Sequence, residues 1–198
     1  MLLLTLLTVA SAEDVRDLVN AWRVSYNAAV DLYDAGKYPE ALVLVEEAVQ
    51  RAPPSQVRNP LILQASLAGE LREYELALNS LDRLLPDAGV PWNVFFNGAI
   101  TARIGGYPAS AHRYSRAAWA RGKGHEAEIA PLFVSTAIDV ELWDEAVKVS
   151  VSVPPSEDYL LASLTRELVA HRRCAQARTV ASRLPPDEER EELLGSCE

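Results

Sequence analysis

The chain has 198 residues, of which 49% are apolar and 24% charged, so it is long enough for one domain with a sizeable core. Its formal net charge of −9 argues against general binding to nucleic acids. Alanine, leucine, glutamate and arginine are abundant, whereas alternating β-branched runs are scarce, and this composition favours an all-α fold.

Residues 1–12 form an apolar run, MLLLTLLTVASA, that ends in the small residues Ala10, Ser11 and Ala12. The run is shorter than the roughly 20 residues that span a bilayer, so it predicts a signal peptide cleaved after Ala12. No lysine or arginine precedes it, which leaves a buried first helix of an intracellular protein as the alternative. We therefore expect an exported protein, periplasmic or extracellular. Residues 13–198 contain no further run long enough for a membrane helix.

The clearest pattern lies in residues 22–53, where apolar residues three and four apart predict two amphipathic helices joined by a turn at Gly36. Ala29 and Ala41 are small where the two helices would meet, and Tyr38 follows the turn. These positions resemble a tetratricopeptide repeat. The resemblance implies an α-solenoid, an all-α superhelix in which helix-turn-helix units stack and bury one another's apolar faces.

Four further stretches resemble the same unit less completely. The residues expected just after each turn are 36, 33, 36 and 31 positions apart, and the mean of 34 is the tetratricopeptide period. They are Tyr38, Tyr74, Tyr107, Trp143 and Cys174. In the second unit Arg72 replaces the turn glycine, which predicts a tighter or slightly strained turn. About five repeats are expected within the domain, near residues 22–55, 58–89, 91–122, 127–154 and 158–184.

A capping helix is expected over residues 187–195, after the helix-breaking pair Pro185 and Pro186. The hinge at this pair lies midway between the two cysteines, so a hairpin of equal arms brings Cys174 and Cys197 side by side. Together with export, this predicts a disulfide that stabilises the cap by roughly 3 kcal/mol. Two unrelated thiols are the alternative.

The sequence lacks the motifs of catalytic and metal centres. His125 and Glu126 resemble the start of a zinc-protease motif, but Ile129 stands where the second ligand is needed. His112, His125 and His171 are therefore expected on the surface, and neither a cofactor nor a metal is expected. We expect no enzyme. An envelope enzyme or ligand-binding protein would need a convergent polar pocket, for which no residues stand out.

The stretch from Trp92 to His125 contains five basic residues and no acid. Four of them form a predicted basic patch: Arg113, Arg116, Arg121 and Lys123. An ordinary solvated face paired with acidic neighbours is one interpretation. The other is a docking patch for an acidic partner or for anionic headgroups at a membrane surface.

In tetratricopeptide proteins the first helices of successive repeats line a groove that binds extended peptides or partner helices. The resemblance places this role on Arg23, Tyr26, Val30, Tyr33, Asn59, Ile62, Trp92, Phe95 and Arg103. Packing between neighbouring helices is the alternative for the aromatic members. A chaperone-type carboxylate clamp is excluded, because Tyr26, Val30 and Ala99 stand where lysine and asparagine are needed.

The expected function is therefore a non-catalytic scaffold or adaptor that binds a protein partner. We place it in a bacterial envelope or periplasmic assembly, with an intracellular adaptor as the alternative.

Overall fold

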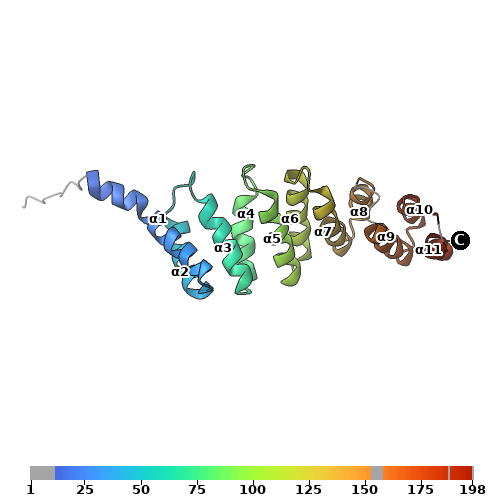
Figure 1. Cartoon of the computed structure of the whole chain (residues 1–198), viewed down its shortest axis with the longest axis horizontal. Helices are drawn as coiled ribbons and strands as arrows, with labels where there is room; N and C mark the ends of the chain where they lie inside the picture. Colours follow the sequence, from blue (N-terminus) through green and yellow to red (C-terminus); the bar gives the residue numbers. More distant parts are fainter. Residues whose placement is uncertain (1–11, 153–157, 187, 198) are drawn as a thin grey trace, which may run out of the picture. The chain divides into compact units, whose positions relative to one another are not determined.

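A computed structural model describes residues 12–152, 158–186 and 188–197, and every regular element in these ranges is helical (Figure 1). The chain divides into two compact units, residues 1–84 (unit 1) and residues 85–198 (unit 2). Unit 1 contains α1 (Ala12–Asp34), α2 (Tyr38–Arg51), α3 (Arg58–Glu70) and α4 (Tyr74–Leu84). Unit 2 contains α5 (Trp92–Ile104), α6 (Pro108–Arg121), α7 (Glu126–Asp139), α8 (Trp143–Ser150), α9 (Asp158–Ala170), α10 (Cys174–Ala181), α11 (Glu188–Leu194) and a final 3-10 turn (Gly195–Cys197). The predicted all-α fold of helix pairs is confirmed.

The five described helix pairs share one kind of turn. In each, a residue with a left-handed φ follows the first helix, and the next amide bonds to the carbonyl five residues earlier, as Lys37 does to Leu32 at 2.9 Å and Leu142 to Ala137 at 2.8 Å. This is the Schellman arrangement, which satisfies carbonyls that the helix end leaves open. The left-handed residues are Gly36 (71°), Arg72 (62°), Gly106 (81°), Glu141 (60°) and Arg172 (57°).

The turns set a common register for the helices that follow. Five residues beyond each left-handed residue stands an alanine with no exposed surface: Ala41, Ala77, Ala111, Ala146 and Ala177. In the third pair the left-handed residue is Gly106, so α6 begins at Pro108, one residue later than the sequence-based placement of Tyr107. The small buried residue of this pair is therefore Ala111.

The strained turn predicted at Arg72 provides a stability test. A left-handed conformation costs a residue with a Cβ roughly 1–2 kcal/mol, and the extra freedom of glycine in the unfolded chain offsets part of the relief. Arg72→Gly is therefore expected to stabilise the protein by about 0.5–1 kcal/mol in urea unfolding. Arg83→Gly, an exposed position inside α4, is the matched control and should destabilise by up to about 1 kcal/mol. Equal losses in both variants would contradict this account of the turn.

Each unit has its own apolar core. In unit 1, Ala29 of α1 packs with Ala41 and Val45 of α2 and with Leu67 of α3. In unit 2, the larger cluster joins α7, α8, α9 and α10 and extends to the C-terminal cap. In unit 2, α5 packs on α7 and α9 packs on α11, while α8 contacts both α7 and α9, the two helices that carry most of the candidate site.

The C-terminal cap is joined covalently to the last helix pair. Cys174, the first residue of α10, forms a disulfide with Cys197, and their Cα atoms lie 5.4 Å apart, as the hairpin argument requires. The Arg178 guanidinium donates a hydrogen bond to the Cys197 carbonyl at 2.7 Å. Leu193 and Leu194 pack against the unit 2 core. The described cap helix, α11, starts at Glu188, inside the expected range of 187–195.

The expected signal peptide lies almost wholly outside the described residues, which begin at Ala12 as the first residue of α1. No described helix is both long and apolar enough to cross a membrane.

Candidate functional site

Unit 2 contains a hollow of about 470 Å³, and all of its described lining residues belong to odd-numbered helices. We call it the α7/α9 hollow. It is lined by Arg103 of α5, by Pro131, Val134, Ser135, Ile138 and Asp139 of α7, and by Tyr159, Leu160, Ser163, Leu164 and Glu167 of α9. The members from each helix recur three and four residues apart, so they share one helix face.

The hollow has an apolar part and a charged part. Pro131 on α7 and Tyr159 on α9 belong to the first halves of their helices, whereas Asp139 and Glu167 belong to the last turns. Tyr159 is 84% exposed, the largest exposed fraction among the big apolar side chains of the described residues. Tyrosine and tryptophan are enriched among the residues that dominate binding energy at interfaces, so Tyr159 is a candidate binding anchor.

An ion pair crosses from α5 to α7 at the charged part. The Arg103 Nε atom donates to the Asp139 Oδ2 atom at 2.8 Å, and the two side chains are 49% and 30% exposed. A pair with this exposure contributes at most about 1 kcal/mol to stability. Its larger effect is to neutralise the Asp139 carboxylate and to hold Arg103 at the edge of the hollow. Arg103, one of the predicted groove residues, thus lines the α7/α9 hollow, and its role in binding stays a prediction.

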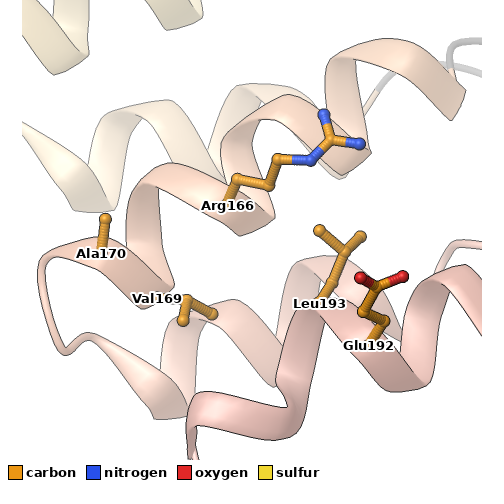
Figure 2. Close-up of a pocket in the computed structure, with 5 residues that line it drawn as sticks. All are labelled: Arg166, Val169, Ala170, Glu192 and Leu193. Carbon is orange, nitrogen blue, oxygen red and sulfur yellow. The ribbon is translucent and has the colours of Figure 1, made fainter.

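A second hollow, of about 510 Å³, lies between α9 and α11. Figure 2 shows its lining from both helices: Arg166, Val169 and Ala170 of α9 with Glu192 and Leu193 of α11. We call it the α9/α11 hollow. Since Cys197, which the disulfide joins to Cys174, lies in the 3-10 turn directly after α11, we expect this hollow to depend on the disulfide.

The predicted groove residues of unit 1 are accessible in part. Arg23 and Asn59 are exposed, and the Arg23 guanidinium donates to the Gln56 side chain at 3.0 Å. Tyr33 is partly buried, and burial, with the nearby Tyr38 and the acidic Glu70 and Asp34, raises the pKa of its phenol. The remaining three are also partly buried: Tyr26, Val30 and Ile62. Their role in binding stays a prediction.

Phe95 cannot contact a partner, and its assignment to the groove was wrong. Its side chain has no exposed surface, stacks on Tyr114 with ring centroids 6.4 Å apart, and lies beneath the Arg121 guanidinium at 4.6 Å. Counting from Gly106 moves the groove face of α5 by one residue, to the partly buried Phe96 and the exposed Ile100. Ile100 also takes the place assigned to Ala99 and, like it, cannot serve a carboxylate clamp.

Trp92 is partly buried between the rings of His125, at 4.7 Å, and Phe96, at 5.7 Å. These contacts show that Trp92 packs within unit 2, which was the alternative considered for the groove aromatics.

One of the four residues of the predicted basic patch, Arg121, is engaged in hydrogen bonds within unit 2. The Arg121 guanidinium donates to the carbonyls of Leu85 at 2.8 Å and Ala117 at 3.1 Å, so it ties α6 to the segment before α5 and is unavailable to an acidic partner. Arg116 lies 3.5 Å from the Glu145 carboxylate. Arg113 and Lys123 are exposed, and docking through these residues stays a prediction.

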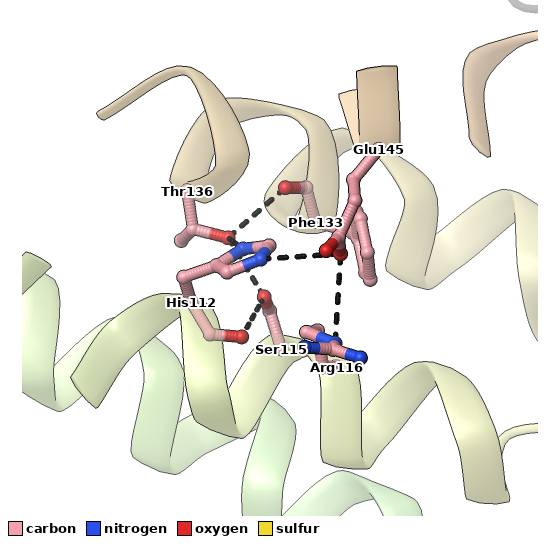
Figure 3. Close-up of polar contacts among 6 residues, drawn as sticks. All are labelled: His112, Ser115, Arg116, Phe133, Thr136 and Glu145. Atoms are coloured by element: carbon pink, nitrogen blue, oxygen red, sulfur yellow. Dashed lines mark hydrogen bonds and ion pairs between the residues drawn. The ribbon is translucent and has the colours of Figure 1, made fainter. Parts of the chain in front are cut away.

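His112 is not on the surface as expected, because only 5% of it is exposed (Figure 3). Its Nδ1 atom lies 3.5 Å from the Thr136 hydroxyl and its Nε2 atom 3.4 Å from a Glu145 carboxylate oxygen. The Thr136 hydroxyl also lies 2.7 Å from that of Ser115. Ser115 and Thr136 have no exposed surface, so no substrate reaches either hydroxyl, and the cluster joins α6, α7 and α8 rather than forming an active site. Among the described residues no group of His, Cys, Asp and Glu could hold a metal ion.

The buried His112 makes the stability depend on pH. Burial lowers its pKa below the ordinary value, although the Glu145 carboxylate acts in the opposite direction. As the pH falls below about 6.5, the unfolded chain binds a proton that the folded protein disfavours, so the free energy of unfolding should decrease. His112→Gln is expected to show a weaker decrease between pH 7 and 5 in urea titrations. The exposed His125→Gln serves as the control and should retain the wild-type slope. An unchanged slope in His112→Gln would contradict this assignment.

Solved structures with similar folds cover most of the chain. YrrB, described as a TPR protein with an unusual peptide-binding site, aligns with a TM-score of 0.63 at 13% identity, over 92% of this chain and 89% of that chain. A double mutant of MamA from RS-1 aligns with a TM-score of 0.60 at 16% identity, over 90% and 97% of the two chains. MamA residues 41 to the end, from Desulfovibrio magneticus RS-1, align with a TM-score of 0.59 at 16% identity, over 84% and 92%.

The fold is that of tetratricopeptide-repeat proteins. At these identities the similarity establishes the tetratricopeptide-like fold alone. No protein-family model matches the chain, and no curated protein matches it in sequence. The five Schellman turns and the buried alanines that follow them are the features of this sequence that produce the fold.

Proposed function

We propose that this chain is a non-catalytic scaffold for protein interactions and that the α7/α9 hollow binds an extended segment of a partner protein. The observation that carries the proposal is the exposed Tyr159 beside a hollow that the face of α7 and α9 lines. Tyrosine is enriched among the residues that dominate binding energy at interfaces, so its exposure beside a concavity supports a binding surface.

The dimensions of the hollow suit a peptide. Its lining runs from Tyr159 to Glu167 along α9, which is about 12 Å at the 1.5 Å rise of a helix. An extended peptide covers that length with about four residues at 3.3 Å each. Its backbone would lie along the hollow while alternate side chains enter it, and Ser135 and Ser163 could exchange hydrogen bonds with the peptide. The peptide-binding site in the description of YrrB supports the same use of the fold.

A catalytic role has less support in the described residues. The cluster that most resembles a catalytic arrangement, His112 with Thr136 and Glu145, has its hydroxyl groups sealed inside unit 2. The α7/α9 hollow contains one basic side chain and no histidine or cysteine among its lining residues. Binding without chemistry is therefore the function we propose, with an enzyme or small-ligand protein as the disfavoured alternative.

We also propose that the protein works in an oxidising compartment, such as a bacterial periplasm or cell envelope. The Cys174–Cys197 disulfide supports this location, since disulfides persist where thiols are not kept reduced. Intact mass of the protein isolated from its native host, with and without reductant and alkylation, tests the proposal. Loss of residues 1–12 with no alkylation before reduction is the expected result. An intact Met1 with two free thiols would favour the intracellular adaptor.

Selection from a random library of displayed 12-residue peptides tests the binding function. Enriched peptides should bind the Tyr159→Ala variant about tenfold or more weakly, because removing an aromatic hot spot at an interface costs about 2 kcal/mol or more and about 1.4 kcal/mol is tenfold in affinity. Leu142→Ala is the matched control, since Leu142 is an exposed apolar residue of unit 2 that does not line the hollow. Enrichment of no peptide, or equal affinity of both variants and the wild type, would contradict the proposed site.

A further inference from the structure

We infer that the α7/α9 hollow selects partner segments that carry a basic side chain about three residues from an apolar one. The inference rests on the proposed function, and it names the chemistry of the partner at the same site.

The charged part of the hollow is acidic. It holds two carboxylates, Asp139 and Glu167, and one guanidinium, Arg103, so its formal charge is −1. Arg103 is committed to Asp139 at 2.8 Å. The Glu167 carboxylate lies 4.0 Å from the His171 Nε2 atom, a contact that is an ion pair only when the imidazole is protonated. The Glu167 carboxylate, 49% exposed, is therefore the charge that a ligand can neutralise.

The helix ends reinforce this negative potential. Asp139 is the last residue of α7 and Glu167 lies in the last turn of α9, and neither last turn contains a basic residue. The C-terminal end of a helix dipole carries partial negative charge, so carboxylates are unfavourable there and cations are favourable. Two acids held at two adjacent helix C-termini in one hollow thus create a site that a cationic side chain would stabilise.

The opposite part of the hollow accepts an apolar side chain. Pro131 of α7 and Leu160 of α9 line it beside the exposed Tyr159. Leu160 and Glu167 are seven residues apart on α9, about 10 Å along the helix axis. Three residues of an extended peptide cover about 10 Å, which gives the separation of the apolar and basic side chains in the bound segment.

A charge-reversal selection tests the inference. The random displayed library is selected on the wild type and on Glu167→Lys, a change that places a favourable charge in the last turn of α9 and should leave the fold intact. The wild type is expected to enrich peptides with lysine or arginine three residues, give or take one, from an aliphatic or aromatic residue. These peptides should bind Glu167→Lys at least tenfold more weakly, whereas Glu191→Lys, an exposed position on α11 outside the hollow, should bind them as the wild type does.

The outcomes separate the two proposals. Enrichment of peptides that lose affinity in Tyr159→Ala but carry acidic or no charged residues would overturn the inference while the proposed function stands. The same holds if basic peptides bind Glu167→Lys and the wild type equally. A selection that enriches no peptide on the wild type would overturn the proposed function and the inference together.

Discussion

Replacing Phe95 by alanine is expected to destabilise unit 2 by about 3–5 kcal/mol. The side chain has no exposed surface, and its ring stacks on Tyr114 while the Arg121 guanidinium lies over it. Its removal leaves a cavity in a close-packed interior, and the Arg121 guanidinium loses the aromatic ring against which it packs. Arg121 in turn bonds to the Leu85 carbonyl, so the start of unit 2 should loosen as well. Urea unfolding followed by circular dichroism measures the loss.

Phe96→Ala is the matched control for this change. Phe96 is the neighbouring aromatic residue on α5, is partly buried, and contacts Trp92 edge to face. We expect a loss of about 1–2 kcal/mol, since less apolar surface leaves the interior. A larger loss in Phe96→Ala than in Phe95→Ala would contradict the one-residue shift of register assigned to the third helix pair.

Removing the disulfide is expected to cost unit 2 roughly 3 kcal/mol, because Cys174 and Cys197 lie 23 positions apart and their loop regains its freedom in the unfolded chain. A variant with both Cys174→Ser and Cys197→Ser should also lose amide protection in α11, whose seven residues are too few to form a stable helix alone. Hydrogen exchange read by mass spectrometry resolves α11 from the repeats before it.

The same experiment contains its own control. Reductant should lower the protection of α11 in the wild type and change nothing in the double serine variant. Protection of α11 that survives reduction and alkylation would show that the packing of Leu193 and Leu194, rather than the disulfide, holds the cap.

The sequence predicted the repeat architecture because its determinants are local. A glycine or a tolerated left-handed residue, followed five positions on by alanine, marks each turn within one short window, as Gly36 and Ala41 do. The turn at Arg72 could be placed although it lacks glycine, because Ala77 stands five residues later and the spacing between repeats is kept. The pair Gly105 and Gly106 was ambiguous, since either glycine can adopt the left-handed conformation, and this one-residue choice moved Phe95 onto the wrong face.

The α7/α9 hollow was harder to predict, because it lies in the repeats whose sequences depart furthest from the pattern. Ala29 and Ala65 stand seven residues before the left-handed residues of their turns. In α7 and α9 the same position is taken by the larger Val134 and Thr165. Without the small residue, the faces of these helices could not be assigned, and Tyr159 and Glu167 were not singled out.

His112 was expected in water because a histidine on a helix gives no local sign of burial. The buried Ala111 and Ser115, which lie close to His112 on α6, are the neighbours that indicate which side of this helix faces the core.

The most direct test of the account is amide chemical-shift mapping of the protein with a peptide selected from the random library. The largest shifts are expected at Ser135, Ile138, Ser163 and Glu167, which line the α7/α9 hollow from both sides. Arg113 on α6 and Lys148 on α8, which are exposed but do not line it, should keep their positions. Shifts confined to α6, α8 and α10, or to residues 12–84, would show that the hollow is not the binding site.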